Sequence, residues 1–65
     1  MRLMLNGEPY DFQGDTIRDL LLSLEIHGRR LAVEVNQEIV PKSEHDTFSL
    51  SENDVLEIVH AIGGG

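Results

Sequence analysis

The sequence predicts an α+β fold in which one helix packs across one face of a small mixed sheet. Two observations carry this expectation. Apolar residues alternate in several short runs, which is typical of strands, and one stretch instead repeats with the period of a helix. A chain of 65 residues without cysteine allows one domain, whose small core has no disulfide or cysteine-bound metal to support it.

The first expected element is a β-hairpin. Apolar residues alternate at positions 3–5 and again at 10–12, on either side of Asn6-Gly7. This dipeptide is a strong signal for a two-residue hairpin turn. Pro9 cannot donate a backbone hydrogen bond, so we expect the second strand to lie at an edge of the sheet.

A helix of about ten residues is expected next. Its apolar face follows the spacing i, i+3, i+4, i+7 and consists of Ile17, Leu20, Leu21 and Leu24. Asp15 or Thr16 can cap the first turn, and Asp19 is well placed at the positive end of the helix dipole. Gly28 suits a left-handed stop after the last turn.

The rest of the chain predicts further strands separated by polar segments. In order, they are a strand at 31–36, a short apolar piece at 39–41, a loop at 42–46, a turn at 51–54 and a final strand at 55–62. This ββαβ(β)β order is that of the β-grasp, or ubiquitin-like, fold. In that fold the first and last strands lie parallel in the sheet centre. We therefore expect one domain at 1–62 and a flexible glycine tail at 63–65.

The net charge of the chain limits the classes of partner that it is expected to bind. Five basic residues against 12 acidic ones give a net charge of −7, which disfavours nucleic acid and anionic membranes. No apolar run approaches the roughly 20 residues that cross a bilayer, and no targeting segment is recognised. We expect a cytoplasmic protein. Its acidity suits basic patches on partner proteins, or simply maintains solubility.

Catalysis by side chains is not expected, so the chain is predicted not to be an enzyme. Its serines and threonines lie in no nucleophile motif, and no glycine-rich phosphate loop opens a helix. The three histidines lack the spacing of a zinc site and are expected at the surface or half-buried: His27, His45 and His60. No metal or bound cofactor is predicted.

The glycines that follow the final strand are the remaining candidate for a functional site. They could be a frayed terminus or a cloning remnant. Without Cβ atoms, however, Gly63 and Gly64 can thread a channel too narrow for other side chains. Three extended residues reach about 10 Å, which would carry the carboxylate of Gly65 into a partner's active site. Transfer of AMP from ATP would turn a carboxylate oxygen into a leaving group, and the adenylate could then accept sulfur.

Two segments, Val33–Pro41 and Val55–Gly65, together with the length and element order, resemble the ThiS family of sulfur carriers in thiamine biosynthesis. The resemblance covers the whole chain. It implies that a ThiF-type enzyme adenylates Gly65 with ATP. Sulfur originating from a cysteine desulfurase then yields a terminal thiocarboxylate, which supplies thiazole synthase, ThiG. The small subunit of molybdopterin synthase and a plain β-grasp interaction module with incidental glycines remain alternatives.

The final strand also suggests a docking surface. Leu56 and Ile58 share one face, so if they face the helix, Val59 lies on the outside. Exposed apolar residues often mark partner sites. We therefore expect Val59 to contact a partner and Ile62 to anchor the mouth of its channel. Alternatively, Val59 is an ordinary strand residue and Ile62 closes the core.

Overall fold

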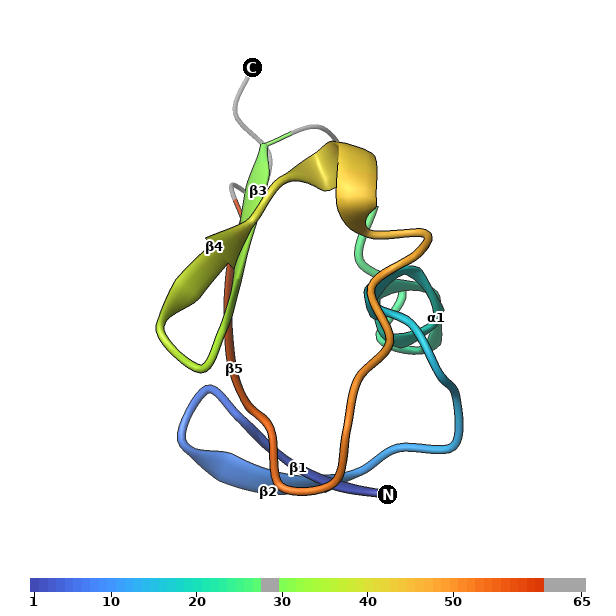
Figure 1. The fold of residues 1–65 in the computed structure, drawn as a ribbon, viewed down its shortest axis with the longest axis vertical. Helices are drawn as coiled ribbons and strands as arrows, with labels where there is room; N and C mark the ends of the chain where they lie inside the picture. Colours follow the sequence, from blue (N-terminus) through green and yellow to red (C-terminus); the bar gives the residue numbers. More distant parts are fainter. Residues whose placement is uncertain (28–29, 61–65) are drawn as a thin grey trace.

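The computed structural model describes residues 1–27 and 30–60, and within them five strands form one mixed sheet with a helix on one face (Figure 1). The elements are β1 (Arg2–Leu5), β2 (Glu8–Asp11), α1 (Ile17–Ser23), β3 (Leu31–Val35), β4 (Glu38–Val40), the 3₁₀-helix η1 (Lys42–Glu44) and β5 (Val55–His60). The strand order is β2-β1-β5-β3-β4. The predicted α+β fold is confirmed.

Strand β5 occupies the centre of the sheet, as expected for the last strand of this fold. It pairs in parallel with β1, where Met4 lies opposite Val55. On its other side it runs antiparallel to all of β3, from Leu31 opposite His60 to Val35 opposite Leu56. The strand that carries Pro9, β2, lies at an edge, also as predicted.

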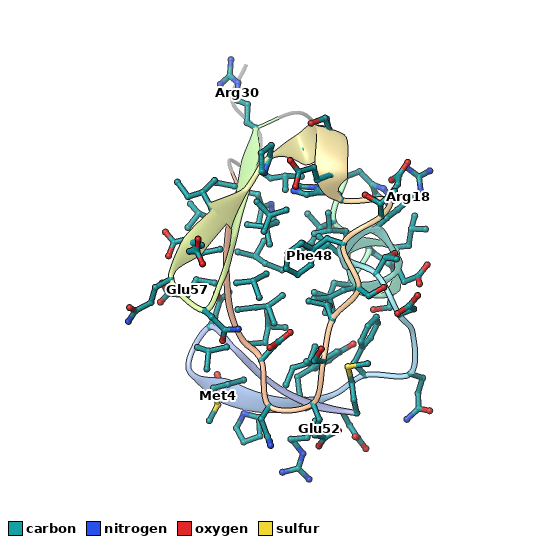
Figure 2. The ribbon with its side chains drawn as sticks, viewed as in Figure 1. Met4, Arg18, Arg30, Phe48, Glu52 and Glu57 are labelled. Carbon is teal, nitrogen blue, oxygen red and sulfur yellow. The ribbon has the colours of Figure 1, made fainter. Side chains whose placement is uncertain are left out.

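The core lies between the sheet and α1, where Figure 2 shows Phe48. Its buried members are Leu3, Phe12, Ile17, Leu20, Leu21, Val33, Val35, Val40, Leu50, Leu56 and Ile58. The predicted apolar face of the helix is therefore largely correct, with Leu24 packed at its margin. Leu56 and Ile58 of β5 belong to this core, so the central strand is held by burial as well as by pairing on both sides.

The N-terminus of α1 is held by a reciprocal pair of hydrogen bonds. Thr16 is the cap, and its Oγ1 accepts from the N–H of Asp19 at 3.2 Å. Asp19 Oδ2 accepts in return from the N–H groups of Thr16 and Asp15, both at 3.1 Å. These two donors lower the pKa of the Asp19 carboxyl below its ordinary value.

The end of the helix differs from the prediction. The helix has seven residues rather than about ten, and it stops at a left-handed Glu25 with φ of 58°. The N–H of Glu25 donates to the Leu22 carbonyl, and that of Ile26 donates to Leu21, which is the Schellman pattern. Gly28, the predicted stop, lies outside the described residues and beyond the observed end, so that prediction was wrong.

Two further segments were not anticipated in detail. Residues expected as a plain loop contain η1, and His45 behind it is buried, with a ring nitrogen 3.0 Å from the Val40 carbonyl oxygen. Strands β3 and β4 are joined by Asn36-Gln37, whose φ angles are 52° and 72°. Two consecutive left-handed residues are the geometry of a type I′ hairpin turn, which normally prefers glycine at the second position.

Candidate functional site

The candidate site is the strand that precedes the glycine tail, and two asparagines outside that strand hold it in place. Asn36 binds its beginning: the Asn36 N–H donates to the Val55 carbonyl at 2.7 Å, and its Oδ1 accepts from the Val55 N–H at 3.0 Å. Its Nδ2 also donates to Asp54 Oδ1 at 3.0 Å. Asn36 therefore binds both the backbone N–H and the backbone carbonyl of Val55, the first residue of β5.

Asn6 holds the later part of β5 in a similar way. Its side-chain Oδ1 accepts from the Ile58 N–H at 2.8 Å, while its Nδ2 donates to the Ile58 carbonyl at 3.3 Å. Strand β1 has already ended at Leu5, so this amide takes the place of the missing backbone neighbour. Without it, two polar groups beside the core would lose their protein partners.

The same conformation explains why asparagine occupies both positions. Asn6 and Asn36 have φ angles of 48° and 52°, in the left-handed region that asparagine tolerates better than most residues. Each residue therefore forms a turn and clamps β5 at once. The Asn6-Gly7 pattern predicted Asn6 as a turn residue, but its contact with β5 could not be read from it. One feature of the sequence could have indicated this contact: Asn6 directly follows the first strand, which was expected to lie beside the final strand.

The sidedness predicted for β5 is confirmed. Leu56 and Ile58 are buried, whereas Val59 is 71% exposed and Val55 is 47% exposed. Val59 therefore lies on the outer face, at the end of β5 from which the chain continues toward the glycines. Its contact with a partner remains a prediction. Ile62, Gly63, Gly64 and Gly65 lie outside the described residues, as does the predicted domain boundary.

The outer face around Val59 combines aliphatic and acidic side chains. In the next row of the sheet, Glu57 lies opposite Glu34, and Glu34 lies opposite Ile39. Ile39 is 68% exposed, and Figure 2 shows Glu57 on the side of the sheet away from α1. Such a face can bind a partner through aliphatic contact and attract basic side chains at the same time.

The described residues contain no alternative centre with metal-binding geometry. Residues 1–27 and 30–60 include no group of three or more histidine or carboxylate side chains that could hold a metal ion. His27 is exposed and His60 is half-buried, as expected, whereas His45 is buried and contacts a backbone carbonyl. None of the helices in these residues is long and apolar enough to cross a membrane.

Comparison with known proteins identifies the family. The ThiS family model matches residues 3–65. The chain is 42% identical over 65 aligned positions to the sulfur carrier protein ThiS of Bacillus subtilis, covering 97% of this chain and 98% of that protein. This chain belongs to the ThiS family. The family resemblance drawn from segments 33–41 and 55–65 is thereby confirmed.

Two further similarities extend this result. A crystal structure of the thiamine biosynthesis protein ThiS from Geobacter metallireducens aligns with a TM-score of 0.82 and 28% identity, covering all of both chains. This agreement confirms the β-grasp fold. The chain is also 46% identical over 66 aligned positions to a thiazole synthase of Paramagnetospirillum magneticum. That match covers all of this chain but only 20% of the synthase, so the chain spans about a fifth of that relative.

Proposed function

We propose that this protein is a sulfur carrier of thiamine biosynthesis and that the carboxylate of Gly65 is its working group. A partner adenylating enzyme of the ThiF type uses ATP: a carboxylate oxygen attacks the α-phosphorus, and pyrophosphate leaves. Persulfide sulfur from a cysteine desulfurase then attacks the acyl carbon and displaces AMP, and a thiol reductant cleaves the resulting acyl disulfide to leave the thiocarboxylate. The protein acts as a co-substrate in the cytoplasm. Its partners supply the catalytic groups and the nucleotide site.

The observation that carries this proposal is the family match, which extends through the three glycines. The fold supports it physically, because β5 is central, paired on both sides and clamped by Asn6 and Asn36. A reactive terminus is useful to a partner only if its base has a defined position. Gly63 and Gly64 would then pass through a narrow channel that side chains would block.

The relatives support thiamine rather than molybdopterin as the pathway. The Bacillus subtilis relative is named a sulfur carrier protein ThiS, and the Geobacter structure is of a thiamine biosynthesis protein. The likeness to one part of a thiazole synthase supports that enzyme as the recipient of the sulfur, because proteins that act together are often joined in one chain.

Mass spectrometry tests the chemistry directly. The full chain is incubated with its adenylating enzyme, ATP, a cysteine desulfurase, cysteine and a thiol reductant. We expect the mass increase of one oxygen-to-sulfur exchange, and we expect none when Gly65 is deleted. The deletion variant should keep the melting temperature of the parent. Conversion of the truncated chain, or failure of the intact chain to convert, would contradict the proposal.

Gly64→Ala tests passage through a channel separately from the presence of the carboxylate. One added methyl group should lower the rate of adenylation roughly 100-fold by displacing the reacting carboxylate, with an unchanged melting temperature. An alanine variant as active as the parent would show that the channel is wide.

Partner docking at the outer face is tested by two matched valines. Val59→Ser should weaken binding to the adenylating enzyme or to thiazole synthase, measured by calorimetry. Val55→Ser is the control, because it makes the same change on the same face of β5, about 13 Å farther from the tail. Equal effects of the two variants would exclude a specific role of Val59. Ile62→Ser completes the set: a large loss of stability with unchanged affinity would assign Ile62 to the core.

A further inference from the structure

A shallow groove lies on the helix side of the molecule, away from the outer sheet face that carries Val59. It has a volume of about 400 Å³ and runs between α1, the start of β3 and the segment around η1. Figure 1 shows η1 beside the start of β3, at the end of the molecule opposite the N-terminus. Leu31, which lines the groove, pairs with His60 at the end of β5, so the groove lies near the last residue of the central strand.

The floor and one wall of the groove are aliphatic. Leu21 is buried, Ile26 and Leu31 are half-buried, and Leu22 is 53% exposed on the wall. The Schellman turn that ends α1 directs Ile26 to this position, since its N–H is bonded to the Leu21 carbonyl. The groove therefore offers a continuous apolar strip to a side chain from another molecule.

The rim has the opposite charge to the rest of the protein. Arg18 and Lys42, two of the five basic residues, line the groove together with one carboxylate, Asp46. With histidines neutral, two positive charges and one negative charge give a local charge of +1, in a chain whose net charge is −7. Exposed His27 and buried His45 add nitrogen donors or acceptors to the same lining.

The walls of the groove are held at a fixed separation. The backbone N–H of Arg18 donates to the His45 carbonyl at 3.0 Å, which joins α1 to the segment after η1. The side chains of Arg18 and Asp46 also form an ion pair at 3.4 Å between the same two segments. Both side chains are more than half exposed, so the pair is weak and Arg18 can exchange partners at little cost.

We propose that this groove binds a segment of a partner protein that carries aliphatic and acidic side chains. An aliphatic side chain would lie over Leu21, Ile26 and Leu31, while carboxylates would pair with Arg18 and Lys42. Charge complementarity selects this occupant, because a basic segment would be attracted to the acidic outer sheet face instead. The groove is thus a second docking surface, and its occupation leaves Val59 accessible.

The test uses a short blocked peptide of leucine and glutamate residues, followed by NMR of the full-length protein. We expect the amide signals of Leu22, Ile26 and Lys42 to shift on titration with the glutamate peptide. The same peptide with lysine in place of glutamate should leave these signals unchanged. Equal binding of the two peptides, or no shift in the groove, would overturn the proposal.

Matched charge reversals locate the binding site. Lys42→Glu should lower the affinity for the glutamate peptide about five- to tenfold. This is the effect of exchanging one favourable surface charge pair for an unfavourable one. Arg2→Glu makes the same change in net charge on β1, outside the groove, and should have a much smaller effect. Equal losses of affinity in the two variants would mean that binding depends only on the net charge of the protein, and would overturn the proposal.

Sedimentation of the protein without peptide tests whether the groove instead binds a second copy of this chain. Our proposal expects a monomer at the concentrations used for NMR, with or without Lys42→Glu. A dimer that Lys42→Glu dissociates would assign the groove to self-association and would overturn the proposal of a separate partner.

Discussion

Asn6→Gly tests whether a turn residue holds the central strand. Glycine keeps the left-handed turn beside Gly7 but removes the two side-chain hydrogen bonds to Ile58. Loss of a partner for a buried polar group costs about 1–3 kcal/mol. These groups are partly buried and water can replace some of the bonding, so we expect a total loss of about 2 kcal/mol.

For a domain of this size, each kcal/mol lowers the melting temperature by about 4–8 °C. Asn6→Gly should therefore melt about 8–16 °C below the parent in a thermal scan followed by circular dichroism. Hydrogen exchange should also accelerate at the Ile58 amide before it accelerates at Val33, because the clamp acts on β5 alone.

Asn53→Gly is the matched control. Asn53 is also left-handed, with φ of 71°, and the hydrogen bond described for it comes from its backbone N–H to the Arg2 carbonyl. The control therefore reports the cost of adding glycine to the unfolded chain, about 0.4–1 kcal/mol. If Asn6→Gly and Asn53→Gly lose the same stability, the side-chain clamp does not stabilise β5 and our reasoning is wrong.

Three further changes test local features. Glu25→Gly should raise the free energy of unfolding by about 1 kcal/mol, since glycine relieves the left-handed conformation after α1; a urea melt in which it is no better than Glu25→Ala would contradict this. Gly14→Ala should cost about 1–3 kcal/mol in the same assay, because its Cβ would lie 2.5 Å from the Phe12 ring and 2.9 Å from Asp19 Cβ. NMR titration should give Asp19 a pKa below 3.8. Its capping contribution is then present above the unfolded carboxyl pKa and lost as the pH falls through the lower folded value, whereas titration at or above 3.8 would refute this.

Local sequence patterns determined most of the framework. The alternation around Asn6-Gly7 indicated the first hairpin, the spacing from Ile17 to Leu24 indicated the buried helix face, and Pro9 indicated an edge strand. The sidedness of β5 also followed from alternation alone. These features depend on residues close in sequence. Their periodicity and turn geometry are the same in any fold that buries one face of each helix or strand.

The tertiary structure decided the features that join distant segments. The bond from Ile58 to Asn6 spans 52 positions in the sequence, and no local pattern reports such a pair. The early end of α1 at Glu25 and the turn at Asn36-Gln37 likewise place residues other than glycine in left-handed conformations. The groove beside Lys42 arises where three separate elements meet. Such positions are set by packing around a shared core, which compensates for local strain that the sequence alone would disfavour.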